Sequence, residues 1–174
     1  MILAISPTYT TLTSPPNVGA SALGERAPAM APFTVMEDDR VRVTAILVPH
    51  GPVFPAFAFR FDTDHGAVTF SGDTRRSENL NALARSSDLL IHEAMRIPPN
   101  SELTAAALDH MLQSHVLVED VGEIAQSANV PQLVLSHLVD FGGPIDPEEW
   151  QRLAKRGYDG DVTIGMDLMG IRLA

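Results

Sequence analysis

The segment Val41–Ser71, which reads VRVTAILVPHGPVFPAFAFRFDTDHGAVTFS, decides the fold class of this chain. Val41–Val48 is β-branched and aliphatic, which favours a strand, and the Pro-His-Gly-Pro cluster behind it ends that strand. Ala56–Phe61 alternates, so it predicts a second strand with its phenylalanines on one face. Asp64-His65-Gly66 predicts a tight turn into a third strand, Ala67–Ser71. The ordered part of the chain therefore begins with paired strands.

Helical and strand patterns alternate after this segment. Helices are expected from the N-cap Ser77 to about Arg85, over Ser101–Leu112, over Val118–Ala128, and from Pro147, capped by Asp146, to about Gly157. Short apolar strands are expected at Leu89–His92, Gln132–Leu135, Val162–Ile164 and Met169–Leu173. Paired strands followed by strand–helix alternation predict an α/β layered (α+β) domain over residues 41–174.

Residues 1–40 differ from the rest in composition. Their prolines, at positions 7, 15, 16, 28 and 32, stand among small and polar residues without a clear hydrophobic period. Such a stretch buries too little apolar surface to offset the entropy lost on ordering. We therefore expect an irregular, linker-like segment here, with ordered structure from about Val41.

The overall composition excludes several classes of protein. The 174 residues suit one domain, and 22 acidic against 12 basic residues give a net charge of −10, which is unfavourable for binding nucleic acid by bulk charge. The absence of cysteine excludes disulfides and thiolate metal ligands, whereas six histidines are available. No apolar run approaches the ~20 residues of a membrane span, and the N-terminus lacks the features of a signal peptide. A cytoplasmic protein without a membrane partner is expected.

Polar side chains follow several of the predicted strands at the point where each strand ends. His50, Asp73, His92 and His137 all occupy such positions. In layered α/β folds, ligand-binding groups gather beyond strand ends. A single histidine there is more often a hydrogen-bonding residue, but four imidazole or carboxylate groups together suit a divalent metal such as zinc, manganese or iron.

Five stretches of the chain resemble, in order, the C-terminal half of the metallo-β-lactamase superfamily, and its tRNase Z and arylsulfatase-like branch in particular. They are VTAILVPHGPVFPAFAFRF (43–61), VTFSGDT (68–74), DLLIHEA (88–94), SHVLVEDVGEIA (114–125) and VPQLVLSHL (130–138). The resemblance covers roughly Val41–Ala174 and implies the C-terminal half of an αββα sandwich. It also implies a metal-dependent hydrolase of a phosphodiester, sulfate or similar ester, in which a hydroxide bridges two divalent ions, normally zinc.

The same resemblance implies roles for individual residues. His50 and His137 are expected as metal ligands, and Asp73 as the carboxylate that bridges the two metals and takes part in catalysis. His115 is expected to assist departure of the leaving group, oriented by Glu93 of the His92-Glu93-Ala94 segment.

Two features depart from the family pattern. The His-x-His-x-Asp-His loop that supplies most metal ligands is absent, because histidines occur only at positions 50, 65, 92, 110, 115 and 137. Three interpretations therefore stay open: a hydrolase whose coding region is truncated, a missing half that comes from another chain, and a degenerate half-domain that no longer catalyses and forms a homodimer through an exposed apolar sheet face. The tight turn at His65 also leaves no room for a tRNA-gripping arm, which favours a small-molecule ester or phosphodiester over tRNA 3′-end processing, the main alternative.

Other residues carry weaker expectations. Arg75 and Arg76 follow Asp73 closely and suit either an anionic substrate group or an exposed loop. His65 and His110 are expected on the surface, outside the ligand set. Core or pocket-wall positions are expected for Phe54, Phe57, Phe59 and Phe61.

Overall fold

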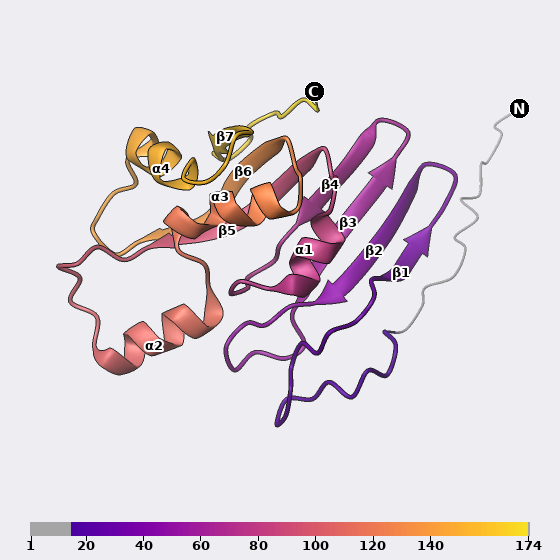
Figure 1. Ribbon diagram of the computed structural model, residues 1–174, viewed down its shortest axis with the longest axis horizontal. Helices are drawn as coiled ribbons and strands as arrows, with labels where there is room; N and C mark the ends of the chain where they lie inside the picture. The colour runs from indigo at the N-terminus through magenta and orange to yellow at the C-terminus, as the bar shows by residue number, and fades with distance from the viewer. Residues whose placement is uncertain (1–14, 174) are drawn as a thin grey trace, which may run out of the picture.

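The computed structural model describes residues 15–173, which form one seven-stranded sheet with its strands in sequence order (Figure 1). The strands are β1 (Phe33–Glu37), β2 (Val41–Leu47), β3 (Phe57–Thr63), β4 (Gly66–Phe70), β5 (Leu89–Arg96), β6 (Gln132–Asp140) and β7 (Asp161–Ile164). The helices are α1 (Glu78–Ala84), α2 (Ala105–Ser114), α3 (Val118–Ser127) and α4 (Pro147–Ala154). β1–β4 are antiparallel, and β4–β7 are parallel. The predicted α/β class is confirmed.

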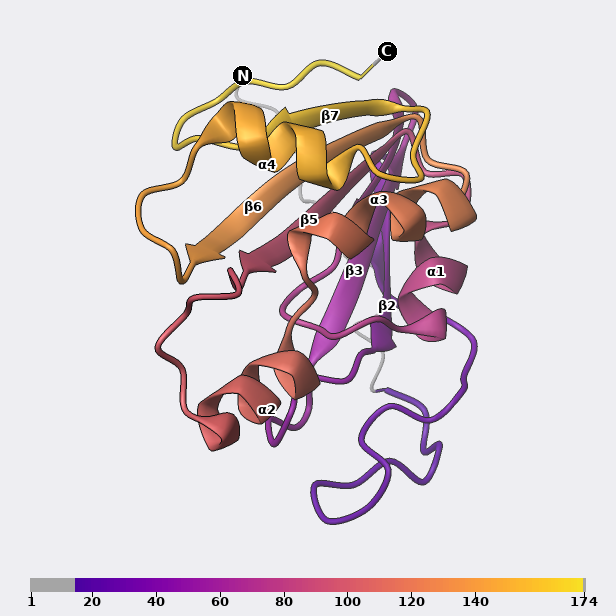
Figure 2. The same ribbon diagram turned by 60° about the vertical axis from the view of Figure 1, so that its left-hand side comes forward.

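Helices α1, α3 and α4 cover one face of the sheet, whereas α2 lies apart from it (Figure 2). Helices α1 and α4 begin at the N-cap residues that the sequence predicts. The Ser77 hydroxyl accepts a hydrogen bond from the Leu80 N–H, and the Asp146 carboxylate accepts hydrogen bonds from two N–H groups of α4. The core between helices and sheet contains the fully buried side chains of Ile46, Leu90 and Trp150.

The other face of the sheet carries a group of aromatic side chains, which we call the phenylalanine face: Phe33, Phe57, Phe59, Phe61 and Phe70. Strand register puts them together, because Phe59 pairs with Phe70 while Phe33 and Phe59 both pair with Ala45. Phe59 is 36% exposed and Phe70 is 40% exposed. The prediction of a core or pocket-wall position for Phe59 is therefore wrong, since the described helices that pack on the sheet lie on its other face.

Several element boundaries differ from the sequence-based expectation. β1 lies within the segment expected to be irregular, because it gains backbone partners from β2. β5 and β6 extend further than predicted, because each supplies hydrogen-bond partners to the other as far as Arg96 and Asp140. A strand at Met169–Leu173 is not found, since the sheet ends with β7 at Ile164.

The remainder of the N-terminal segment follows the expectation where it is described. Residues 15–32 contain neither helix nor strand, while residues 1–14 lie outside the described part of the chain. The division into a linker-like segment and a domain from residue 41 stays a prediction. Among the described residues, no helix has the length and apolar character needed to cross a membrane.

Candidate metal-binding site

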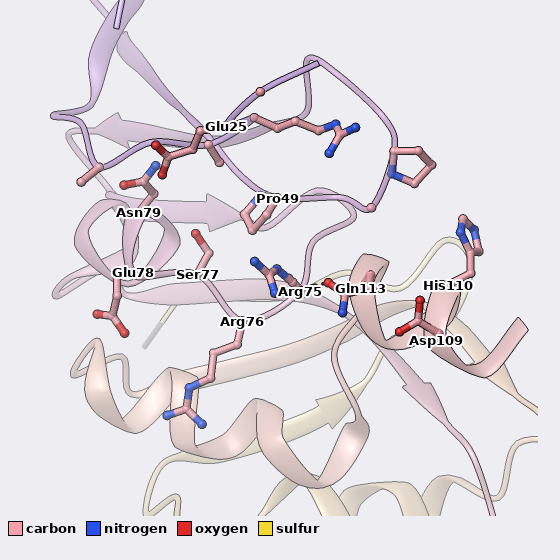
Figure 3. Close-up of a pocket in the computed structure, with 16 residues that line it drawn as sticks. Glu25, Pro49, Arg75, Arg76, Ser77, Glu78, Asn79, Asp109, His110 and Gln113 are labelled. Carbon is pink, nitrogen blue, oxygen red and sulfur yellow. Dashed lines mark hydrogen bonds between the residues drawn. The ribbon is translucent and has the colours of Figure 1, made fainter. Parts of the chain in front are cut away.

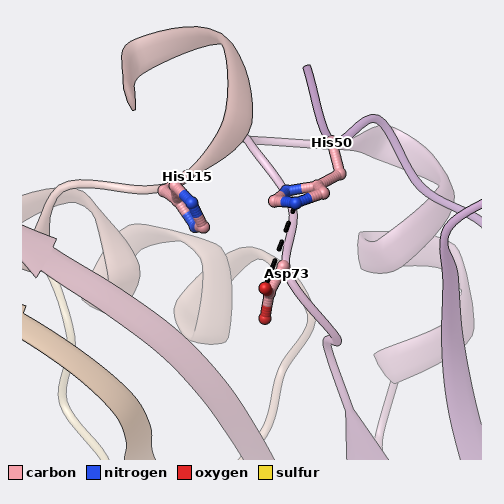
Figure 4. Close-up of side chains that lie close together, drawn as sticks. All are labelled: His50, Asp73 and His115. Atoms are coloured by element: carbon pink, nitrogen blue, oxygen red, sulfur yellow. Dashed lines mark ion pairs between the residues drawn. The ribbon is translucent and has the colours of Figure 1, made fainter. Parts of the chain in front are cut away.

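Four side chains from separate parts of the sequence meet at one end of the sheet. His50 follows β2, Asp73 follows β4, His115 follows α2, and His137 lies within β6. Figure 4 shows His50, Asp73 and His115 facing one another. One ligand atom from each of these three residues lies within 4.8 Å of the others. We call His50, Asp73, His115 and His137 the histidine–aspartate cluster.

His50 is oriented by the end of α2. Its Nδ1 lies 3.0 Å from the Ser114 carbonyl oxygen, which can only accept a hydrogen bond. In the neutral ring, Nδ1 therefore carries the proton, and Nε2 presents its lone pair 4.0 Å from Oδ2 of Asp73. The adjoining Gly51 has φ +45°, and a Cβ there would collide with the Ser114 hydroxyl, so the loop requires glycine.

Asp73 is held by the turn after β4. Gly72 has φ +60°, and a Cβ at this position would collide with the Phe57 carbonyl oxygen. On the other side of Asp73, the Thr74 N–H donates to Oε1 of Glu93, and the Thr74 hydroxyl donates to the Pro49 carbonyl. These contacts place the Asp73 carboxylate between the rings of His50 and His137.

His137 reaches the cluster through a β-bulge. Glu93 pairs with Ser136 and Ala94 pairs with Leu138, so His137 is an extra residue in β6. Its φ of +49° is left-handed, a conformation that costs a non-glycine residue roughly 1–2 kcal/mol. The bulge brings Nε2 of His137 to 3.3 Å from Oδ2 of Asp73. The sequence predicted a ligand beyond the strand end, whereas the structure places His137 within a longer strand.

Glu93 and His115 form a second, more buried part of the site. Oε1 of Glu93 accepts from the N–H groups of Thr74 and Val116, and it lies 3.4 Å from Nδ1 of His115. Burial raises the pKa of Glu93 to about 8, against the opposing effect of those two hydrogen bonds. Burial, followed by the nearby His50, lowers the pKa of His115. The site therefore favours the uncharged forms of both partners.

His92, which the sequence grouped with the strand-end ligands, lies outside the cluster. β5 continues through His92, so alternation directs His92 and Glu93 to opposite faces of the sheet. His92 is fully buried, its Nδ1 lies 2.5 Å from the Glu93 carbonyl oxygen, and its Nε2 has no hydrogen-bond partner among the described residues. Burial lowers its pKa to about 4.

The structure thus brings together His50, Asp73 and His137, and adds His115 with Glu93 beside it. His65 and His110 are exposed and lie outside the cluster. The donor set of imidazole nitrogens and a carboxylate fits a borderline divalent ion such as zinc. Because the ring centroids of His115 and His50 are 5.0 Å apart, the geometry also permits His115 to be a ligand.

No protein-family model matches the chain, but individual relatives do. It is 32% identical over 132 residues to a putative ribonuclease Z of Mycobacterium tuberculosis, an alignment covering 75% of this chain and 59% of that protein. A ribonuclease Z of Mycolicibacterium gilvum is 28% identical over 162 residues, covering 93% of this chain and 54% of that protein. The chain thus spans about half the length of these relatives.

Two solved structures share the fold. The metallo-β-lactamase fold protein YhfI from Bacillus subtilis aligns with a TM-score of 0.59 and 21% identity, over 78% of this chain and 50% of that one. The short form of human tRNase Z aligns with a TM-score of 0.56 and 22% identity, over 82% of this chain and 47% of that one. The chain is therefore a metallo-β-lactamase fold protein, as its motifs predict. Its sequence relatives are ribonuclease Z homologues.

Proposed function

We propose that this chain carries part of the active site of a cytoplasmic, zinc-dependent hydrolase that cleaves a phosphodiester, sulfate or similar ester. The observation that carries the proposal is the histidine–aspartate cluster, to which four separate segments each contribute one side chain of metal-ligand type. Similarity to ribonuclease Z proteins supports the phosphodiester over the other esters.

His50, Asp73 and His137 are the proposed metal ligands. Oδ2 of Asp73 lies 4.0 Å from Nε2 of His50 and 3.3 Å from Nε2 of His137, so these three side chains would hold a divalent ion together. A divalent ion bound there would supply Lewis-acid polarisation of the ester and would lower the pKa of bound water.

His115 and Glu93 are the proposed proton-transfer pair. The Glu93 carboxyl group, fixed by the Thr74 and Val116 N–H groups, holds the Nδ1 side of the His115 ring. One ring nitrogen of His115 lies within 4.8 Å of ligand atoms of His50 and Asp73. When Nε2 delivers its proton to the oxygen of the leaving group, Nδ1 can take up the proton of the uncharged Glu93 carboxyl group, so the ring stays neutral. Glu93 is a positioning residue, because it acts through His115.

Metal content and turnover of bis-para-nitrophenyl phosphate test these roles. We expect at least about one zinc per chain after purification without chelators, and loss of zinc in His50→Ala and His137→Ala. His115→Ala should keep its zinc and lose turnover by 100-fold or more, within the range of a general acid. His65→Ala, in the exposed β3–β4 turn, is the matched control. Loss of zinc in His115→Ala would instead identify His115 as a ligand.

Cleavage of tRNA precursors is a second candidate activity, favoured by the ribonuclease Z relatives. The β3–β4 connection argues for a smaller substrate, since Thr63 pairs with Gly66 and leaves only a tight turn there. Activity on a precursor tRNA, compared with bis-para-nitrophenyl phosphate at equal enzyme concentration, separates the two substrates.

An inactive half-domain is the third candidate, and the phenylalanine face favours it. An apolar sheet face of this kind requires a covering partner, for which a second copy of the chain is the simplest choice. This candidate predicts dimers in sedimentation together with no bound zinc. A monomer that unfolds cooperatively would contradict it.

A further inference from the structure

A cavity of about 690 Å³ adjoins the histidine–aspartate cluster (Figure 3). The two neighbours of His50 in the chain, Pro49 and Gly51, line it. The turn after Asp73, the C-terminal half of α2 and the loop at residues 24–29 contribute its other walls. A volume of this size accommodates a ligand as large as a nucleotide.

Arg75 connects this cavity to the cluster. It lines the large cavity and also a smaller one of about 230 Å³ that includes His115. Its N–H donates to the Pro49 carbonyl, which fixes its backbone beside His50. Figure 3 shows its side chain beside Gln113, and Nη1 lies 3.4 Å from the Gln113 amide oxygen. Within residues 15–173, no carboxylate lies within 4.0 Å of this guanidinium group.

Arg26 lines the same cavity from the opposite loop. Its Nε is buried and has no hydrogen-bond partner among the described residues. Within residues 15–173 the Arg26 guanidinium group makes no hydrogen bond or ion pair, so its outer nitrogens, Nη1 and Nη2, are available to an acceptor that enters the cavity. Glu25, Glu78 and Asp109 also line the cavity, yet the described structure has no ion pair between them and Arg26 or Arg75.

Arg76, the residue after Arg75, differs from it in having a carboxylate partner. Its Nη1 donates to Oε2 of Glu123 at 3.1 Å, so its charge is already paired. The cavity therefore combines two guanidinium groups that have no carboxylate partner within residues 15–173, in a chain with a net charge of −10. Guanidinium groups bind phosphate through paired, charge-assisted hydrogen bonds.

We infer that Arg75 and Arg26 bind a phosphate group of the substrate next to the ester held at the histidine–aspartate cluster. This inference rests on the proposed function and deepens it, because it makes the substrate a phosphorylated compound of nucleotide size. The Gln113 amide can donate a further hydrogen bond to the same phosphate.

Calorimetric titration of the 174-residue chain with adenosine monophosphate and with adenosine tests the inference. We expect the monophosphate to bind at least 10-fold more tightly than adenosine, both with zinc present and after chelation. Arg75→Gln and Arg26→Gln should each weaken monophosphate binding about 10-fold and leave adenosine binding unchanged. Arg42→Gln, in strand β2 where Arg42 pairs with Glu37 of β1, is the matched control. Circular dichroism melts confirm that the variants are folded.

Equal binding of the two ligands would overturn the inference. So would monophosphate binding that requires zinc, is lost in His137→Ala and persists in Arg75→Gln, because the phosphate would then sit on the metal site. Arginine-dependent binding in a chain that hydrolyses no ester would support the phosphate site and contradict the proposed function, so the two failures are distinguishable.

Discussion

The side chains on the two faces of strand β5 have different roles. Leu90 and His92 point into the helix-covered core, where both are fully buried. Ile91 and Glu93 point to the opposite face, and Glu93 reaches the histidine–aspartate cluster. The comparison shows that one residue of register separates packing from chemistry. Leu90 and His92 pack under the helices, whereas Glu93, which is also buried, contacts His115 on the other face.

The largest expected effect is on packing. Leu90→Ala should lower the free energy of unfolding by about 2–5 kcal/mol, because it leaves a cavity in a filled core. Ile91→Ala, its neighbour on the less buried face, should cost less than half as much. Urea unfolding of both variants measures the difference. Equal losses would mean that a partner covers the second face in solution.

The next effect is a dependence of stability on pH. The unfolded chain protonates His92 near its ordinary pKa of 6.5, whereas the folded chain resists protonation until about pH 4. The contribution of His92 to stability is therefore full above pH 6.5 and falls by about 3 kcal/mol as the pH is lowered to 4. Glu93, whose pKa burial raises to about 8, contributes an opposing gain of similar size over the same range, so the His92 contribution is measured as a difference between variants.

Urea midpoints between pH 4 and 7 measure this dependence. His92→Leu should gain about 3 kcal/mol of stability relative to the wild type between pH 7 and pH 4, while His65→Leu in the exposed turn should follow the wild type at every pH. A stability difference between His92→Leu and the wild type that does not change with pH would contradict the lowered pKa of His92.

A smaller effect is expected at a helix that covers the sheet. Asp146→Ala removes the side-chain acceptor for the N–H groups of Glu148 and Glu149, so α4 should lose about 1 kcal/mol. Asp146→Asn should retain most of that stability, because asparagine is an equally good cap. Thermal unfolding measures both variants. A loss in Asp146→Asn as large as in Asp146→Ala would assign the effect to charge rather than to capping.

The smallest change in stability is expected on the phenylalanine face. Phe59→Thr exchanges a 36% exposed aromatic ring for a residue of good strand propensity, so stability should change by less than about 1 kcal/mol. Its effect should appear instead in self-association, measured by sedimentation over a range of concentrations. A large loss of stability without any change in association would show that this face packs within the chain.

The sequence predicts best where the determining interactions are local. The caps at Ser77 and Asp146 and the β3–β4 turn depend on neighbouring residues, and the structure has each of them. The strand β1 was missed because its stability comes from pairing with β2, which outweighs a proline-rich composition.

The candidate site was predictable to a similar extent. The motifs identified His50, Asp73, His115 and His137, and these residues do meet. The sequence predicts that β5 ends at His92, which makes His92 a strand-end ligand. In the structure β5 continues to Arg96, and strand alternation directs the His92 side chain into the helix-covered core. The bulge at His137 and the buried Nε of Arg26 depend on contacts between distant segments, for which no local pattern exists.

The left-handed backbone at His137 has a consequence for how this protein could evolve. Glycine or asparagine tolerates that conformation better than histidine does. A library at position 137 that is selected only for thermal resistance should therefore drift towards glycine and asparagine. Only a screen that rewards function should recover histidine. At this bulged position, selection for thermal resistance and selection for function therefore favour different residues.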